Sequence, residues 1–343
     1  MQWPKKKLLK IGLCCLGVLF LSSCGKKAAV ESTRIYVGVS CYDQSDIFVK
    51  ELTTRFEEEI KDIGDAEKLS TIVTIRDAAD SPRQQNSQVQ ELIDAGCNIL
   101  CINLVERTDT SEIIELAKKN NVPVIFFNRE PVAEDLKQWD KLYYVGADAK
   151  ESGTMQGELA AEAILNNPQI DRNGDGVIQY VVLEGEPGHQ DAIIRTEEAI
   201  NTLKNKGIKL EKLGHGIANW NRAQAANRME QLIGEHQNKI ELVLSNNDDM
   251  ALGGLDAYAK LNRTAASTPI FFGVDGTAAG LQAVQEGTLA GTVYNNKDQQ
   301  AKAMAELATA LVTGQSTSSF PFKNGKTLYL PYAKVTQENV DEY

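Results

Sequence analysis

Residues 179–184 read QYVVLE, residues 193–206 read IIRTEEAINTLKNK and residues 210–214 read LEKLG. The two short runs have the length and apolar spacing of strands, whereas the apolar residues of the long run recur with the period of a helix. A strand, a helix and a second strand in succession normally pack with both strands parallel in one sheet. This stretch therefore predicts an α/β fold built on parallel sheets.

The same alternation continues on both sides of this stretch. A chain of 343 residues suits two domains of ordinary size. About ten strands are many for one open sheet, so we expect two sheets of five or six strands. The predicted strands cover residues 35–40, 70–76, 99–104, 122–127, 142–145, 179–184, 210–214, 240–245, 270–274 and 289–293, and the predicted helices cover residues 49–63, 83–95, 111–120, 153–166, 193–206, 221–234, 250–261 and 279–286.

The N-terminus has the residue order of a secretory signal. Four lysines, at positions 5, 6, 7 and 10, precede an apolar run over residues 11–21. That run is shorter than the roughly 20 residues that a membrane-spanning helix needs. Leu21-Ser22-Ser23-Cys24 resembles the lipobox of bacterial lipoproteins, although a short buried helix with an incidental cysteine is the alternative. We expect a signal peptide over residues 1–23, a lipid on Cys24 that anchors the chain to the membrane outside the cytoplasm, and a linker over residues 24–32.

Charge and cysteine content narrow the class of protein. The formal net charge is −11, and removal of residues 1–23 takes away four lysines, which leaves −15. This acidity disfavours nucleic acid as a partner. Cys41, Cys97 and Cys101 remain outside the signal and anchor, and an odd number excludes a full disulfide framework. Buried thiols are a better interpretation of Cys97 and Cys101 than a disulfide or a metal pair.

Polar clusters follow many of the predicted strands. Open parallel sheets bind ligands at the carboxyl ends of their strands. If two such sheets face each other across a cleft, these clusters converge there. They comprise residues 42–46, Asn103, Asn128, the loop of residues 185–191, residues 246–249, Asp275 and Asn295.

In order along the chain, these motifs resemble the galactose/glucose-binding members of the type I periplasmic binding protein family. The resemblance extends from Thr33 to about Glu342 and rests on Ile102-Asn103-Leu104-Val105, Phe126-Phe127-Asn128 with Glu130-Pro131, Tyr143-Tyr144-Val145-Gly146, Gly185-Glu186-Pro187-Gly188-His189, Asn246-Asn247-Asp248, Gly273-Val274-Asp275 and Ala290-Gly291-Thr292-Val293. It implies two doubly wound parallel-sheet lobes joined by a three-strand hinge. We place the crossings near Phe127, Asn295 and Leu330, so that the N-terminal lobe holds residues 33–127 and 296–330 and the C-terminal lobe holds residues 128–295 and 331–343.

The resemblance also implies a sugar site. The family's ligand-binding positions match, in residue type, Asp46, Phe48, Asn103, His189, Asp191, Arg195, Trp220, Asn247, Asp275 and Asn295. A hexose offers hydroxyls that both donate and accept hydrogen bonds, and two weakly apolar faces, so charged partners and aromatic plates suit it. The resemblance implies that Phe48 and Trp220 stack on opposite faces of the sugar, that Asp46 contacts the 4-hydroxyl of either epimer, and that Asp191 contacts the anomeric hydroxyl.

Each of these residues also has an ordinary structural interpretation. The two aromatic residues fit a core, the asparagines fit helix caps or turns, and Asp191 with Arg195 fits an ion pair along one helix. Their joint occurrence in the family's order favours the sugar site. We expect the neighbouring arginine and amides to keep the site carboxyl groups ionised as acceptors, which argues against a glycosidase.

Residues 171–179 read DRNGDGVIQ, the first nine positions of a calcium loop of the EF-hand type. Side-chain oxygens stand at Asp171, Asn173, Asp175 and Gln179, and Val177 offers its carbonyl. Position 12 is Val182, where an EF-hand has a glutamate, so on the loop alone a plain turn before a strand is the better interpretation. The resemblance supplies the missing carboxylate from Glu241 and implies a structural Ca²⁺.

The resemblance implies a binding protein and not an enzyme. The chain has three histidines, no nucleophile elbow and no zinc-protease spacing. We expect it to act as a monomer that binds D-glucose or D-galactose and delivers it to an ABC permease. A sensor that presents its closed form to a chemoreceptor or a sensor kinase is the alternative. A sugar-responsive repressor of the same fold would carry a DNA-binding headpiece where this chain has its signal.

Overall fold

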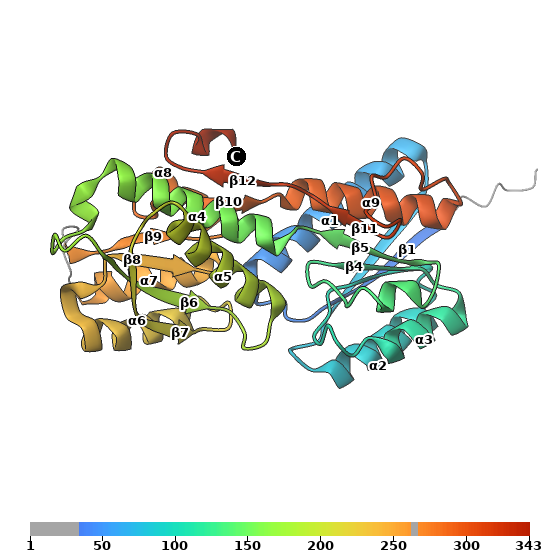
Figure 1. Cartoon of the computed structure of the whole chain (residues 1–343). Helices are drawn as coiled ribbons and strands as arrows, with labels where there is room; N and C mark the ends of the chain where they lie inside the picture. Colours follow the sequence, from blue (N-terminus) through green and yellow to red (C-terminus); the bar gives the residue numbers. More distant parts are fainter. Residues whose placement is uncertain (1–33, 262–266) are drawn as a thin grey trace, which may run out of the picture. The chain divides into compact units, whose positions relative to one another are not determined.

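A computed structural model describes residues 34–261 and 267–343 of the chain. The first sheet has six strands, all parallel, in the order β11-β5-β4-β3-β1-β2. Figure 1 labels four of them, β1, β4, β5 and β11. This arrangement confirms the predicted α/β class. The strands are β1 (Arg34–Cys41), β2 (Ser70–Asp77), β3 (Ile99–Ile102), β4 (Val124–Phe127), β5 (Leu142–Gly146) and β11 (Thr327–Tyr329).

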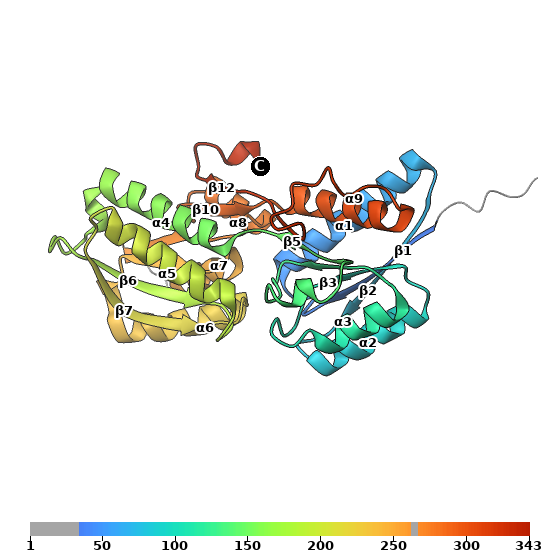
Figure 2. The same ribbon diagram turned by 45° about the vertical axis from the view of Figure 1, so that its right-hand side comes forward.

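Helices cover both faces of the first sheet (Figure 2). Phe56 of α1 and Met304 of α9 are buried in one apolar cluster with Val39 of β1. Leu92 of α2 and Ile113 of α3 are buried in a cluster on the opposite face. Apolar residues on both faces explain why the strands read as nearly continuous apolar runs. The covering helices are α1 (Ile47–Glu67), α2 (Pro82–Asp94), α3 (Ser111–Asn120) and α9 (Lys297–Thr313).

The second sheet has four parallel strands in the order β7-β6-β8-β9. Single bridges, one of them from Asp275 to Tyr294, continue it to the antiparallel pair of β10 and β12. Helices again cover both faces, with α4 and α5 on one and α6, α7 and α8 on the other. The bounds are β6 (Ile178–Glu184), β7 (Leu210–Ile217), β8 (Leu242–Ser245), β9 (Ile270–Phe272), β10 (Thr292–Asn295), β12 (Tyr332–Val335), α4 (Ala149–Asn166), α5 (Gln190–Asn205), α6 (Arg222–His236), α7 (Asp248–Lys260) and α8 (Ala278–Gln285).

The structure corrects one expected lobe boundary. We expected the chain to leave the first lobe near Phe127 and assigned residues 142–145 to the second. Instead, β5 pairs with β4, with Val124 opposite Leu142, and the chain passes to the second sheet after Gly146. The physical reason is burial on both faces, because Tyr144 packs among the residues under α2 and α3 while Val145 packs under α1 and α9.

Helix α9 and strands β11 and β12 were not predicted as a helix or strand. Helix α9 reads KDQQAKAMAELATALVT, in which small alanines blur the apolar stripe that would mark a helix. Strands β11 and β12 have three and four residues, too few for an alternation to stand out.

The described residues contain no helix long and apolar enough to cross a membrane. The predicted signal, Cys24 and the linker lie outside the described residues. Cys41, Cys97 and Cys101 are free and buried, which confirms the interpretation of Cys97 and Cys101 as buried thiols. Burial is the main cause that raises the pKa of Cys41 to about 12, so this thiol is protonated at neutral pH.

Candidate functional site

A small cavity of about 30 Å³ lies where loops at the carboxyl ends of both sheets meet. Of the ten predicted ligand residues, Asp46, Phe48, His189, Asp191, Arg195, Trp220, Asn247 and Asp275 line it, together with Tyr42, Asn128 and Arg129. Strand ends are where parallel sheets present their ligand groups, so the position agrees with the expected geometry.

Asn103 and Asn295, the other two predicted residues, do not line this cavity. Asn103 is fully buried behind it, where its Nδ2 donates to the carbonyl of Phe127 at 3.2 Å and to Oδ1 of Asn128 at 3.0 Å. The side-chain oxygen of Asn295 accepts from Gln300 at 2.6 Å. Both asparagines therefore support residues that face the cavity, Asn128 in the first case and Asp275 in the second, because the backbone N–H of Asn295 donates to the carbonyl of Asp275 at 3.0 Å.

Three of the lining residues are also N-caps of helices. Asp46 accepts from the N–H of Val49 at the start of α1, and Asn247 accepts from the N–H of Met250 at the start of α7. His189 caps α5 through Nδ1. The capping and binding interpretations of these side chains are thus compatible. Capping holds each side chain in one orientation at the rim of the cavity.

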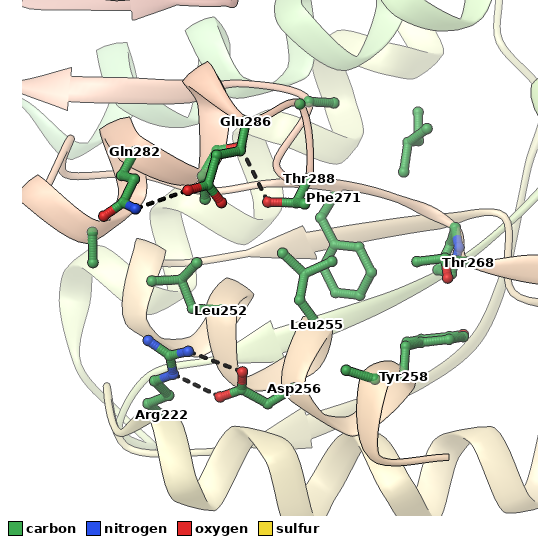
Figure 3. Close-up of a pocket in the computed structure, with 17 residues that line it drawn as sticks. Arg222, Leu252, Leu255, Asp256, Tyr258, Thr268, Phe271, Gln282, Glu286 and Thr288 are labelled. Carbon is green, nitrogen blue, oxygen red and sulfur yellow. Dashed lines mark hydrogen bonds and ion pairs between the residues drawn. The ribbon is translucent and has the colours of Figure 1, made fainter. Parts of the chain in front are cut away.

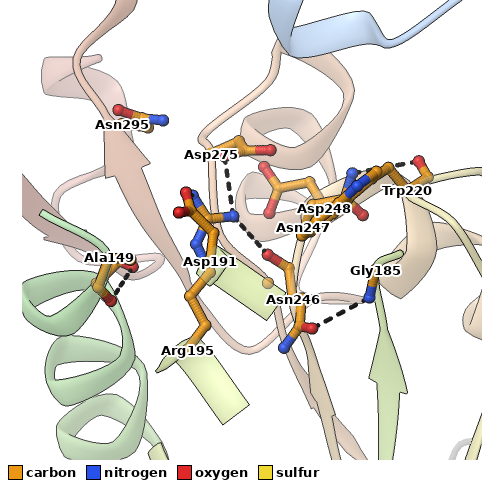
Figure 4. A network of polar contacts seen from close by, with 12 residues as sticks. Ala149, Gly185, Asp191, Arg195, Trp220, Asn246, Asn247, Asp248, Asp275 and Asn295 are labelled. Atoms are coloured by element: carbon orange, nitrogen blue, oxygen red, sulfur yellow. Dashed lines mark hydrogen bonds and ion pairs between the residues drawn. The ribbon is translucent and has the colours of Figure 1, made fainter. Parts of the chain in front are cut away.

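Arg195 is the centre of a buried polar network (Figure 4). Its guanidinium lies 3.5 Å from Asp191 and 3.7 Å from Asp275, and its Nη1 donates to the carbonyl of Asn246 at 2.9 Å. Its Nη2 donates to the hydroxyl of Tyr332 at 3.3 Å. The Nε of this buried arginine has no hydrogen-bond partner within the described parts of the chain. An unpaired buried donor is costly, and a ligand hydroxyl in the cavity would pair it.

Burial changes the acid–base properties of the site. It is the main cause that raises the pKa of Asp46, Asp191 and Asp275 above the ordinary aspartate value. Arg195 opposes the shift at Asp191 and Asp275 without reversing it. From the sequence we expect the neighbouring arginine and amides to set the pKa of these carboxyl groups and keep them ionised. The loss of solvent outweighs them, a quantity that depends on depth in the fold and is not visible in a motif.

His189 is neutral in this environment. Desolvation, followed by the charges of Arg129 and Arg195, lowers its pKa well below the usual value. Its Nδ1 accepts from the backbone N–H of Asp191 at 3.1 Å, which leaves the proton on Nε2. His189 is therefore a hydrogen-bond donor and carries no charge.

Trp220 is held rigidly against the start of the loop of residues 185–191. Its ring occupies the space beside Gly185, where an added Cβ would lie 2.2 Å from the ring. The side chain of Asn247 donates to its carbonyl at 3.2 Å, and the ring of His189 meets its ring edge-on at 5.0 Å. Trp220 also has a positive φ of 61°. A strained backbone that its surroundings hold in place is characteristic of functional sites.

Tyr42, Asn128 and Arg129 line the cavity but were not among the ten predicted residues. Tyr42 and Asn128 belonged to the polar clusters at strand ends, which was the available signal. Arg129 follows the motif Phe126-Phe127-Asn128, and nothing in its local sequence distinguishes it from a surface arginine. It is nevertheless only 5% exposed.

A second, outer cavity of about 380 Å³ adjoins the first. Tyr42, Asp46, Arg129 and Trp220 line both spaces. The inner space holds roughly one water molecule, so a monosaccharide needs these shared walls to move apart before it can enter.

A larger groove of about 650 Å³ lies elsewhere, between α7, α8 and β9 (Figure 3). Its walls are mostly apolar, with Leu252, Leu255 and Phe271 among them, and an ion pair between Arg222 and Asp256 closes one end. None of the predicted ligand residues lines it. The smaller cavity is the stronger candidate because charged and aromatic side chains converge there.

The loop of residues 171–179 folds back on itself. Both oxygens of Asp171 accept from backbone N–H groups, those of Gly174 and Gly176, at 2.8 Å. Glu241 reaches this loop from the second sheet, and its two oxygens accept from the N–H groups of Arg172 at 2.6 Å and Gln179 at 3.1 Å.

Hydrogen bonds within the loop use several of the predicted calcium ligands. Asn173 donates to Gln179 at 3.0 Å, and Gln179 donates to Asp175 at 3.0 Å. The described residues contain no ready-made group of three or more acidic, histidine or cysteine side chains around one point. The oxygen-rich donor set fits calcium chemically, provided that the amides of Asn173 and Gln179 turn their oxygens inward.

Comparisons with known proteins identify the family of the chain. The family model described as periplasmic binding protein domain matches residues 37–316. The D-galactose/methyl-galactoside binding periplasmic protein of Haemophilus influenzae is 36% identical over 330 residues, which are 95% of this chain and 97% of the relative. The ribose import binding protein of Escherichia coli is 25% identical over 85% of this chain and 92% of its own length.

Solved structures have the same fold. An ABC transporter solute-binding protein from Bacillus halodurans with bound myo-inositol superposes with a TM-score of 0.75, at 26% identity, over 92% of this chain and 98% of its own. An ABC transporter periplasmic solute-binding protein from Actinobacillus succinogenes with bound D-allose superposes with a TM-score of 0.75 over 90% of this chain and 100% of its own, at 20% identity. This second structure supports the fold alone.

Proposed function

Because the chain belongs to the periplasmic binding protein family, in which sugar-binding members serve ABC transporters outside the cytoplasm, we propose that it binds D-galactose or D-glucose and delivers it to an ABC permease. The relatives are binding proteins of transport systems, and this chain is likewise a binding protein and not an enzyme. The H. influenzae relative, named for galactose and methyl-galactoside, supports the choice of sugar.

One observation carries the proposal: charged, amide and aromatic side chains from both sheets converge on one buried cavity. The unpaired Nε of Arg195 and the Nε2 of neutral His189 are donors for ligand oxygens. Asp46, Asp191 and Asp275 are acceptors for ligand hydroxyls. Phe48 and Trp220 supply apolar plates. Charge-assisted hydrogen bonds to a neutral polyol explain how a site with several carboxyl groups can serve an uncharged sugar.

The choice of hexose needs a direct test, since relatives named for ribose and xylitol also match this chain. Isothermal titration of the purified protein against hexoses, pentoses and myo-inositol provides it. We expect glucose and galactose to bind and ribose to bind much more weakly, because ribose lacks part of the hydroxyl set. Tight binding of ribose or inositol without hexose binding would contradict the proposal.

Lipid anchoring through Cys24 is a separate proposal, supported by the order of charged, apolar and small residues before it. A triacylated cysteine carries enough acyl chains for stable anchoring. Expression of the parent and of Cys24→Ser, followed by separation of membrane and soluble fractions, tests it. The parent should sediment with membranes and the variant should not. A variant that stays with the membranes would exclude Cys24 as the anchor.

We further propose a structural Ca²⁺ in the loop of residues 171–179. Asp171, Asn173, Asp175, Gln179 and Glu241 would hold it through side-chain oxygens, and Val177 through its carbonyl. The ion would offset the repulsion that arises when the carboxylates of Asp171, Asp175 and Glu241 turn towards one point. The proximity of Glu241 to Arg172 and Gln179 supports this set of ligands.

A further inference from the structure

Arg129 is the first charged residue after β4, and its guanidinium makes three contacts. Its Nη2 lies 2.6 Å from Oε1 of Glu186, and its Nη1 donates to the carbonyl of Val105 at 3.2 Å. The central carbon of its planar guanidinium lies 3.4 Å from the centre of the Tyr42 ring. Arg129 is only 5% exposed, and these three contacts hold its guanidinium in one position.

The ion pair of Arg129 and Glu186 joins the two sheets at the cavity. Arg129 follows β4 of the first sheet, and Glu186 follows β6 of the second. The loop that contains Glu186 leads directly to His189 and Asp191, two lining residues. The pair therefore ties the second-sheet half of the site to the first-sheet half.

The charge of Arg129 is opposite to that of the carboxyl groups around it in the outer cavity. Its lining includes five carboxyl groups, those of Asp43, Asp46, Asp80, Glu186 and Asp249. Arg129 is the one lysine or arginine among the described residues that line it. Repulsion among the carboxylates would separate the two halves, and the single guanidinium between them opposes that separation.

The contacts of Arg129 continue into the inner cavity. The ring under its guanidinium is that of Tyr42, whose hydroxyl donates to Oδ2 of Asp46 at 2.5 Å. The other oxygen of Asp46 caps α1. Contacts thus link Glu186 to Arg129, Arg129 to Tyr42, and Tyr42 to Asp46, which faces the inner cavity. Arg129 therefore both pairs with Glu186 and helps to orient Asp46.

We propose that Arg129 is a latch between the two halves of the site: its ion pair with Glu186 forms as the halves close, and its stacking on Tyr42 then fixes Asp46 and closes the inner cavity off from the outer one. This inference rests on the proposed sugar-binding function. Arg129 is a positioning residue, and its main effect is on how long a bound sugar is retained.

The test measures galactose release and association by stopped-flow fluorescence of the tryptophans in the parent, Glu186→Gln, Arg129→Met, Arg129→Lys and the double variant. Breaking the pair should speed release about tenfold or more, with association changed less than about threefold, because loss of a buried charged contact acts mainly on the dissociation rate. Arg129→Lys keeps the charge but not the flat stack, so its release rate should lie between those of the parent and Arg129→Met. The double variant should match Arg129→Met within about twofold, since both changes remove one interaction.

Asp256→Asn is the matched control. It breaks the ion pair with Arg222, which has the same 2.6 Å separation but lies within one half of the site's scaffold. Its release rate should equal that of the parent. Unchanged release in Glu186→Gln would overturn the latch. Slower release or tighter binding would also overturn it, because Arg129 would then compete with the sugar for the cavity.

A readout without ligand separates the latch from the sugar proposal. The ligand-free protein exchanges between open and closed forms, and loss of a pair made only in the closed form shifts that equilibrium towards the open form. Small-angle scattering without ligand should therefore give a larger radius of gyration for Glu186→Gln than for the parent, whatever the natural ligand is. If the parent binds no sugar but this difference appears, the sugar proposal fails and the latch stands. Equal radii together with unchanged release would leave the sugar proposal intact and refute the latch.

Discussion

The guanidinium of Arg195 lies 3.7 Å from Oδ1 of Asp275, and both side chains are buried at the carboxyl ends of the second sheet. This pair gives the site a cation whose charge is shared between Asp191 and Asp275. Burial still raises the pKa of both carboxyl groups, with Arg195 opposing the shift. The site therefore contains acceptors that become protonated more readily than exposed aspartates do.

We predict that hexose affinity falls on acidification at pH values above the ordinary aspartate pKa of 3.8. A ligand hydroxyl donates to the ionised carboxylate, so binding favours the deprotonated form and is lost as the pH falls through the raised pKa. Each coupled proton can cost up to about tenfold in affinity per pH unit. Titration calorimetry from pH 8 to pH 4 measures this, with circular dichroism as the check that the fold survives. Constant affinity over that range would contradict the prediction.

Trp220 and Gly185 give a second prediction. Trp220→Ala should weaken hexose binding by about 1–3 kcal/mol through loss of an aromatic contact. Gly185→Ala should also weaken it, because the new Cβ would lie 2.2 Å from the present position of the ring and displace it. Trp139→Ala is the control, since Trp139 packs in the first sheet away from the cavity. Unchanged affinity in Trp220→Ala would remove this residue from the site.

The features that the sequence predicts correctly are those in which one motif determines one local structure. The strand and helix periods predicted parallel sheets, and the polar clusters at strand ends lie where loops of the two sheets meet. Features that depend on contacts between distant parts of the chain were not predicted. The membership of β5 in the first sheet depends on two helical layers, and the role of Arg129 depends on Glu186, 57 positions along the chain. The raised pKa values depend on burial depth, which no spacing encodes.

Lobe closure is the third prediction. The small inner cavity and the contributions from both sheets require a hinge motion for ligand entry, and a ligand shifts such an equilibrium only if it contacts the closed form better. Small-angle scattering should show a smaller radius of gyration at saturating galactose than without sugar. Ribose at the same concentration is the control and should leave the curve unchanged. An identical curve with bound galactose would indicate a rigid site.

The fourth prediction concerns calcium. Glu241 contacts the loop of residues 171–179 at both Arg172 and Gln179, so an ion held there would tie the loop to the start of β8. A metal that binds only the folded form stabilises it by an amount set by its free concentration over its dissociation constant, about 2.7 kcal/mol at a hundredfold excess. Calcium should therefore raise the melting temperature of the parent relative to excess chelator.

Two variants separate the metal site from the charge of its surroundings. Glu241→Gln removes a predicted ligand and should reduce the calcium-dependent shift in melting temperature. Glu211→Gln is the control, because Glu211 lies beside Gln179 at 3.3 Å but is not a predicted ligand, and its shift should match that of the parent. Hexose affinity should change little on chelation, since none of the loop residues lines the sugar cavity. Equal melting temperatures of the parent with calcium and with chelator would refute the metal site, whereas a large loss of hexose affinity on chelation would refute a purely structural role.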